Sequence, residues 1–542
     1  MRSLLKYLFL GVCTLIAYLP LSYSASTEAV DNVLNFCGLN SSSSPFSLQP
    51  CELTQAQNVN FTLDGSIKRR NGNALLGGQI NANDVTALYD FFQSDGTQDT
   101  IAVAGTVIAK MDALDGTWDT ITGSVSLTAD ILRDCEVISG TIYCTDNTST
   151  DGTWLWTGSG NAADWDSDFA SSGSIEKARH IAHFHNYTIL ANVELNGGTA
   201  HPSRWYWSDL ADPTTFRTTK FIDVEPNDGC GAIGGVEVLG ERLVIYKERC
   251  GVYNFLFTGN SDIPFIQQKS LCSIGTNAGW SIKNVDNLLF YYSQNNPGIY
   301  AYDGNSCQRI SNKIKPTILG FEEAESATIT AAVHFPLNQY WFAMKNAGSS
   351  EHDRIIVYDF VNNAYSVHTG IEASFMNTLS KSGIQKVYTG DYSGYTLEQD
   401  SGNSDVLDGS TGQTIDSTFK TAWFPLSNPA VTKNVQHTMV YHGLTGDYNV
   451  GFGYSYDFED SDRYSGNFSV SAGGDTWDSF SWDDGTLWAS SGGGSITRID
   501  NNGAGAFYRI RFHHNADNAA WEIYGISPIF RVLGIHRPSS FT

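Results

Sequence analysis

The pattern of apolar and polar positions between residues 230 and 310 occurs twice, and it is the clearest structural signal in the chain. Each copy has a short apolar segment, a polar turn, a nearly continuous apolar run (residues 243–246 and 288–292), a second turn and an aromatic segment. A strand that is apolar at successive positions must be covered on both faces. The packed blades of a β-propeller cover antiparallel hairpins in this way, so the pattern predicts propeller blades.

The turns between these segments have the length and residue types of hairpin turns, with Gly-Glu at 240–241 and Asp-Asn at 286–287. Connections of hairpin length are too short to contain the helical crossovers of an α/β fold. Similar units begin near Val85, Ile131, Ile181, Val236, Ser281, Ala331 and Phe375, at intervals of roughly 40 to 55 residues, a blade-sized period. We therefore expect an all-β protein with a β-propeller of six or seven blades over residues 77–400.

The pattern changes after residue 400. Residues 401–414 are rich in Gly, Ser and Asp and have little to bury, so they predict a linker. Residues 415–542 contain segments in which apolar and polar positions alternate, which is typical of strands with one wet face. We expect a C-terminal β-sandwich there. Residues 25–76, before the propeller, are expected to form a loop-rich leader.

Residues 1–24 have the layout of a secretory signal peptide. Arg2 and Lys6 precede an apolar run over residues 8–21, and small residues follow it. The run is short for a membrane span. The alternative is a hydrophobic N-terminal helix that stays attached to the protein.

Eight cysteines follow this segment, all before residue 308, and they fall in pairs that are close in sequence. After a signal peptide, four local disulfides are the simplest interpretation. The expected pairs are Cys37 with Cys51, Cys135 with Cys144, Cys230 with Cys250, and Cys272 with Cys307. A zinc site is less favoured because the sequence has no Cys-x-x-Cys pair, and free buried thiols are the remaining alternative.

The formal net charge of −25 argues against a surface that wraps nucleic acid by neutralising phosphates. It does not exclude a channel through which DNA slides.

Several segments resemble the β-propeller tail proteins of short-tailed bacteriophages, known as nozzle or head-to-tail stabilisation proteins. The opening GLN…SPFSL, then ELTQAQNVNF and DGSIKRRNG, follow the order found in that family. PSRWYWSDLADPTTF is the most similar segment, and WEIYGISPIFRVLG near the C-terminus is also similar. The family-like motif consists of Arg204, Trp205, Tyr206, Trp207, Ser208 and Asp209.

The resemblance implies a structural virion protein that forms a homo-oligomeric ring, contacts other tail or portal-adaptor proteins, and lets DNA pass without binding it specifically. It implies no cofactor and no catalysis. The signal-like segment and the cysteines depart from the family, because a virion protein assembles in the cytoplasm. Localisation is therefore either the virion tail, or secreted or periplasmic.

Recognisable catalytic motifs are missing from the sequence: it has no Gly-x-Ser-x-Gly elbow, no phosphate-binding Gly-rich loop with Lys-Ser/Thr, and no His-Glu-x-x-His. Within the family-like motif, strand alternation directs Trp205 and Trp207 to one face and Tyr206 to the other. Packing between blades is the ordinary role for such rings, and a sugar-binding platform is the alternative.

Three further groups are candidates for metal binding or for paired carboxylates. Each also has a simpler interpretation, as a polar strand face or a solvated loop. The groups are His180, His183 and His185; Asp164, Asp166 and Asp168; and Asp457, Glu459, Asp460 and Asp462. The alternatives to a virion protein are a secreted propeller that acts as an adhesin or binds carbohydrate, and a secreted hydrolase.

Overall fold

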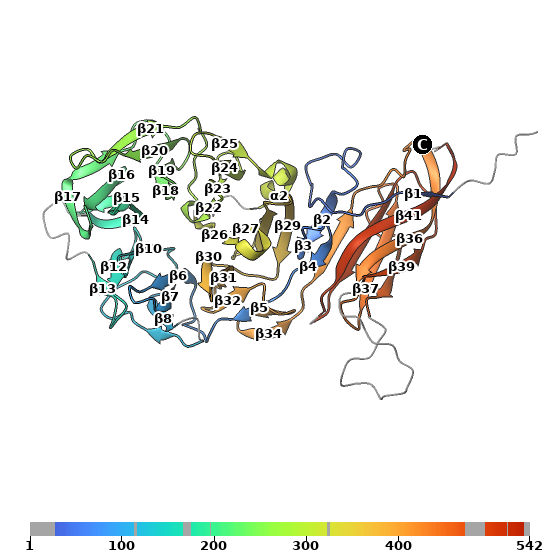
Figure 1. Ribbon diagram of the computed structural model, residues 1–542, viewed down its shortest axis with the longest axis horizontal. Coiled ribbons are helices and arrows are strands. Elements are labelled where there is room, and N and C mark those ends of the chain that lie inside the picture. Colours follow the sequence, from blue (N-terminus) through green and yellow to red (C-terminus); the bar gives the residue numbers. More distant parts are fainter. Residues whose placement is uncertain are drawn as a thin grey trace, which may run out of the picture.

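The computed structural model describes residues 28–112, 116–165, 175–195, 197–321, 326–471, 494–517 and 519–535. These residues form a circle of blades that is joined on one side to a second block of strands (Figure 1). The signal-like segment 1–24 lies outside the described residues, as do Asp166 and Asp168. In the part of the chain that the structure describes, no helix has both the length and the apolar character needed to cross a membrane.

The described residues form seven blades of four strands each, which confirms the expected propeller. Blade 1 contains β6 (Val85–Phe92), β7 (Gln98–Ala104), β8 (Val107–Asp112) and β9 (Asp119–Thr120). Blade 2 contains β10 (Asp134–Ile138), β11 (Thr141–Thr145), β12 (Thr153–Trp156) and β13 (Ala163–Asp164). Blade 3 contains β14 (Ile175–Phe184), β15 (Tyr187–Leu195), β16 (Thr199–Asp209) and β17 (Asp212–Asp223). Blade 4 contains β18 (Ile233–Leu239), β19 (Arg242–Lys247), β20 (Val252–Phe257) and β21 (Phe265–Lys269).

Blade 5 contains β22 (Lys283–Val285), β23 (Leu288–Ser293), β24 (Gly298–Tyr302) and β25 (Cys307–Arg309). Blade 6 contains β26 (Ala331–His334), β27 (Gln339–Met344), β28 (Arg354–Asp359) and β29 (Ala364–Thr369). Blade 7 contains β30 (Phe375–Lys381), β31 (Ile384–Gly390), β32 (Thr396–Gln399) and, from before blade 1, β5 (Asn73–Leu75). Because β5 pairs with β32, the N-terminal side of the chain closes the circle.

Short helices lie in the loops around blades 5 and 6. They are η2 (Gly279–Ser281), η3 (Ser311–Ile314), α2 (Lys315–Leu319), η4 (Ser326–Thr328) and η5 (Phe335–Leu337).

The continuous apolar runs are covered on both faces, as the sequence pattern predicts. In β19, Leu243 and Ile245 join the core shared with blade 3. Val244 and Tyr246 join the core shared with blade 5. Successive side chains of a strand point to opposite faces, so an unbroken apolar run lets one strand seal two blade interfaces.

The C-terminal block consists of two sheets. One is a six-stranded sheet in the order β3-β4-β41-β36-β39, with β1 also paired to β41. The other extends blade 6 into a nine-stranded sheet that runs on through β2, β35, β40, β37 and β38. Phe419 and Phe512 from one sheet and Val440 and Phe530 from the other belong to the same apolar core. The strands are β35 (Ser417–Thr421), β36 (Val431–Gly443), β37 (Asn449–Tyr456), β38 (Tyr464–Ser469), β39 (Gly494–Asp500), β40 (Tyr508–His514) and β41 (Glu522–Ile535).

Short strands occur in both the loop-rich leader and the expected linker. The described part of residues 25–76 holds β1 (Ala29–Val30), β2 (Leu53–Gln57), β3 (Val59–Phe61), β4 (Ile67–Arg69) and β5. The expected linker holds the hairpin of β33 (Asp405–Leu407) and β34 (Ser410–Gln413). These strands are short. β3 and β4 form a local hairpin, but β1, β2, β4 and β5 pair with residues far along the chain, for example Gln57 with Val367. Local patterning does not detect such pairings.

Candidate functional site

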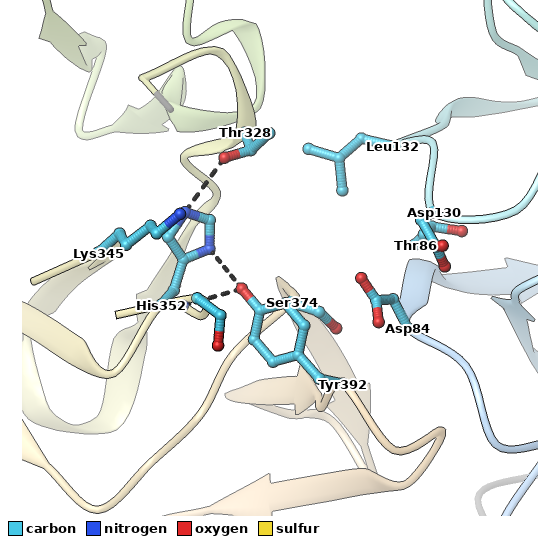
Figure 2. Close-up of a pocket in the computed structure, with 10 residues that line it drawn as sticks. Asp84, Thr86, Asp130, Leu132, Thr328, Lys345, His352, Ser374 and Tyr392 are labelled. Atoms are coloured by element: carbon cyan, nitrogen blue, oxygen red, sulfur yellow. Dashed lines mark hydrogen bonds between the residues drawn. The ribbon is translucent and has the colours of Figure 1, made fainter. Parts of the chain in front are cut away.

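The loops at one end of the propeller surround a polar pocket of about 220 Å³. Strand direction alternates within a blade, so loops that enter a first strand lie at the same end as loops joining second and third strands. Blades 1, 2, 6 and 7 contribute to the pocket (Figure 2). It is lined by Asp84, Thr86, Asp130, Leu132, Thr328, Lys345, Ser350, His352, Ser374 and Tyr392. We call this the loop-end pocket.

One wall of the loop-end pocket is built around His352, which is 4% exposed. Its Nε2 lies 3.2 Å from the Thr328 hydroxyl, and its Nδ1 lies 3.0 Å from the Tyr392 hydroxyl and 3.2 Å from the Ala373 carbonyl oxygen. Burial lowers the pKa of His352 to about 4, so the ring is neutral at pH 7. Because both ring nitrogens are engaged, this histidine is a fixed part of the wall and not a free base.

The opposite wall is acidic, and Figure 2 shows Asp84 and Asp130 facing the pocket from the other side. Burial, with contributions from Asp130 and Glu351, raises the pKa of Asp84 to about 6. Burial and the neighbouring Glu351 raise the pKa of Glu372 to about 7. Asp391, at the same end, has its pKa raised to about 6, mainly by burial. Carboxylates that raise one another's pKa indicate a local excess of negative charge.

A second set of titratable groups lines the central channel. The groups lie on the first strands of the blades, which contact one another around the circle and so form its inner edge. Burial, followed by Glu237 and Asp134, raises the pKa of Glu136 to about 8. Burial lowers the pKa of Lys283, and Glu237 opposes that shift. These groups on the first strands of blades 2, 4 and 5 comprise three carboxyl groups and one lysine.

The loop-end pocket combines a fully engaged histidine with the carboxylates of Asp84 and Asp130 and the hydroxyls of Ser374 and Tyr392. Within the described residues, no group of three or more His, Cys, Asp or Glu side chains is placed to hold a metal ion.

The family-like motif lies on β16 in blade 3 and packs between blades. Trp205 and Trp207 join the core shared with blade 4, and Tyr206 joins the core on the side of blade 2. The two faces predicted from strand alternation are therefore observed. Trp205 contacts Phe255 at a centroid distance of 4.9 Å and is 0% exposed, so these rings are not a platform for a sugar.

The polar ends of this motif make ion pairs. Arg204 donates to both carboxylate oxygens of Asp223, at 2.7 and 2.8 Å, and its guanidinium lies 3.7 Å from the centre of the Phe221 ring. Asp209 accepts from Arg217 and Lys220, which lower its pKa to about 2. Every residue of the motif that sequence analysis singled out thus has a structural role in blade 3.

All four expected cysteine pairs are bonded. The disulfides are Cys37–Cys51, Cys135–Cys144, Cys230–Cys250 and Cys272–Cys307. Three of them lie within the propeller, and Cys37–Cys51 closes a loop in the segment before it. Disulfides of this number are typical of an oxidising environment.

The structure separates the histidines that sequence analysis considered together. The Nδ1 of His180 lies 3.2 Å from Asp134, and this side chain is buried near the channel. His185 stacks on Phe257 and pairs with the exposed Glu241. Burial lowers the pKa of His183. None of these contacts brings the three rings to one point.

The carboxylates between residues 457 and 462 also have structural partners. Asp457 accepts the backbone N–H groups of Ala506 and Phe507, and Asp462 pairs with Arg511. Glu459 and Asp460 are exposed. Asp164 lies on β13.

The loop-end carboxylates were not found by sequence analysis. Asp84 and Glu372 come shortly before the first strands of blades 1 and 7, and Asp130 precedes the first strand of blade 2. An acidic residue within four positions before a first strand in these three blades was the available signal, because the start of each first strand lies at the same end of a propeller.

Comparison with known proteins supplies no family. No protein-family model and no curated protein matches the chain. The WD40 repeats of RRP9 are 10% identical to it, with 61% of this chain and 99% of that chain covered and a TM-score of 0.39. YCF48 bound to a D1 peptide is 10% identical, with coverages of 63% and 97% and a TM-score of 0.36. These overall similarities are low, and the propeller assignment rests on the seven blades of the chain itself.

Proposed function

We propose that the protein is a structural subunit of a short phage tail, and that several copies form a ring through which duplex DNA passes. In this proposal the end of the propeller that carries the loop-end pocket faces the bore. Other tail or portal-adaptor proteins bind above and below the ring.

The gathering of carboxylates at the loop end is the observation that carries the proposal. Asp84, Asp130 and Glu351 lie near one another, and the raised pKa of Asp84 reflects burial first and then repulsion from Asp130 and Glu351. A wall of this kind repels phosphates and releases no counterions, so DNA slides along it without binding. Such a surface fits a protein through which DNA passes, and it does not fit a protein that holds DNA in place.

The connection between the two parts of the subunit supports the same role. The nine-stranded sheet continues from blade 6 through β2 into the C-terminal block, so hydrogen-bonded strands, not a loose linker, join the two parts. A subunit that resists bending between its parts suits a tail component under load.

Mass spectrometry of purified virions tests this proposal. We expect the protein at a fixed stoichiometry to the portal protein, retained after nuclease treatment and gradient purification. Its absence from purified particles would contradict the proposal.

A secreted propeller that acts as an adhesin or carbohydrate-binding protein is the second candidate, and the four disulfides favour it because they form in oxidising compartments. Fractionation of producing cells separates the two candidates. The secreted protein would be found outside the cytoplasm without virions, and a glycan would bind the wild type more tightly than the Asp84→Asn variant of the loop-end pocket.

A further inference from the structure

Blades 5 and 6 leave an apolar groove of about 340 Å³ between them, at the end opposite the loop-end pocket. Leu288, Phe290 and Ala301 line it from blade 5, and Tyr358 and Phe360 line it from blade 6. The volume is near the lower limit of the roughly 300–1,000 Å³ typical of ligand pockets, so the groove holds one or two side chains. We call it the blade 5–6 groove.

The connection between blades 5 and 6 contains short helices. The chain between β25 and β26 forms η3 and α2, and Ile314 and Ile318 from these helices enter the apolar core shared by blades 5 and 6. Leu288, Ala301 and Phe360 are left partly buried at the edge of that core.

The rim of the groove is acidic. Asp286 and Asp303 are exposed at its mouth. Asp303 accepts the backbone N–H groups of Asn305 and Ser306, at 2.8 and 2.7 Å, and these hydrogen bonds lower its pKa, so it is ionised at neutral pH.

A complementary surface lies at the C-terminal end of β41. Val532 and Leu533 are 46% and 62% exposed there. The preceding Arg531 pairs with Glu28 at 3.1 Å, but both side chains are nearly half exposed, so this pair is weak and can exchange its partner. In Figure 1 this end of β41 lies in the C-terminal block, which is separated from blade 5 by blade 6.

We propose that the end of β41 in one subunit binds in the blade 5–6 groove of a second copy of the chain. Val532 and Leu533 pack on the apolar floor, and Arg531 faces the carboxylates of Asp286 and Asp303. The two surfaces are different and lie far apart on one subunit, so the contact is heterologous and closes into a ring when the rotation between copies permits. This inference rests on the proposed ring and names the contact that builds it.

Charge exchange across the proposed contact tests it. Gln308 is exposed on the groove lining, and Gln308→Lys places a positive charge near Arg531 without disturbing the turn that Asp303 forms. Arg531→Glu places a negative charge against the acidic rim. Each single variant should raise the protein concentration at which the ring half-dissociates by about tenfold or more. The double variant should assemble at a lower concentration than Arg531→Glu alone, because the new lysine attracts the new carboxylate.

The measurement is mass photometry or sedimentation velocity on the full chain over a concentration series. Leu533→Asp should also weaken assembly, whereas Ile384→Asp, which changes an exposed residue on blade 7, should not. All four positions are exposed, and circular dichroism should confirm that each variant folds.

The outcomes distinguish the contact from the ring. A wild-type ring that the single variants leave unchanged, or a double variant no better than Arg531→Glu alone, would overturn the contact and leave the ring intact. A wild-type chain that is monomeric at every concentration would contradict both.

Discussion

Arg70 and Asp405 form a bidentate ion pair in which both side chains are only 2% exposed. Arg70 precedes the propeller and Asp405 follows it, so the pair ties together the two ends of the propeller segment. Arg70 also donates to the Asn58 side chain at 2.9 Å and to the Thr369 carbonyl oxygen at 3.0 Å. One guanidinium thus joins the leader, blade 6 and the segment after blade 7.

Breaking this pair should destabilise the fold strongly. Asp405→Ala leaves a buried guanidinium without its counter-charge, so we expect a loss of about 3–5 kcal/mol in the free energy of unfolding. Denaturant unfolding monitored by tryptophan fluorescence measures the loss. Asp500→Ala removes an exposed partner of Arg498 and should change stability by less than about 0.5 kcal/mol. Equal effects of the two variants would contradict the role given to Arg70.

The disulfides should differ in their contribution to stability. Cys272–Cys307 spans a sequence separation of 35 residues and Cys135–Cys144 a separation of 9. The longer loop loses more unfolded-state entropy when it is closed, so replacing Cys272 and Cys307 by Ala should cost roughly 1 kcal/mol more than replacing the other pair. The denaturation midpoints of the two double variants test this. The reverse order would show that native-state packing outweighs loop entropy.

Trp205 should be essential for packing between blades 3 and 4. Its ring contacts Phe255, Phe265 and Trp207 with centroid distances of 4.9 to 5.4 Å. Trp205→Ala should therefore lower the free energy of unfolding by about 3–5 kcal/mol. Leu210→Ala, at an exposed position just after the motif, is the matched control and should have little effect. A Trp205→Ala variant as stable as the wild type would contradict the assignment of this motif to packing.

Stability should fall as pH rises through the folded-state pKa of the buried carboxyl groups. The pKa of Glu136 rises from 4.5 to about 8 and that of Asp84 from 3.8 to about 6, chiefly because of burial. These groups bind protons more tightly in the folded chain, so their contribution is present at low pH and is lost between about pH 4 and pH 8. Glu136→Gln should raise the thermal midpoint at about pH 9 and leave it nearly unchanged at about pH 4. A variant with the same pH profile as the wild type would contradict the raised pKa of Glu136.

Buried histidines change the stability of the fold with pH in the opposite direction. The pKa of His352 falls from 6.5 to about 4 on burial, so the unfolded chain binds its proton more readily. This group removes stability as pH falls from about 6.5 to about 4.

Local patterns in the sequence were sufficient for the blades and the disulfides. The run Leu243 to Tyr246 contains the residues of both faces of its strand, and each cysteine pair is separated by at most 35 positions in the sequence. Pairings between distant residues were not accessible in this way. Arg70 and Asp405 are 335 positions apart. β2, which precedes the propeller, pairs with β29 in blade 6 and with β35 after the propeller.

The loop-end pocket shows the same limit. Asp84 and His352 meet only because the circle of blades closes through β5, and a single Asp before a strand does not indicate its neighbours in space. The repeat nevertheless indicated which loops lie together, because equivalent loops of successive blades emerge at the same end of a propeller.

The acidity of the loop end should keep DNA from binding. We expect the wild-type protein not to retard duplex DNA in a gel, even at low salt, whereas the triple variant Asp84→Lys, Asp130→Lys, Glu372→Lys should retard it. The retardation should disappear as salt increases, because it arises from counterion release. Retention of DNA by the wild type at physiological salt would contradict a conduit.

Cryo-electron microscopy of the assembled particle tests the central claim most directly, because it shows both the ring and the surface that faces the bore. We predict a closed ring in which Asp84, Asp130, Glu351 and Glu372 at the loop end of each propeller line a bore wide enough for duplex DNA. A protein that is monomeric in the particle, or a ring whose bore is lined by Lys and Arg with the loop ends facing outward, would contradict the account.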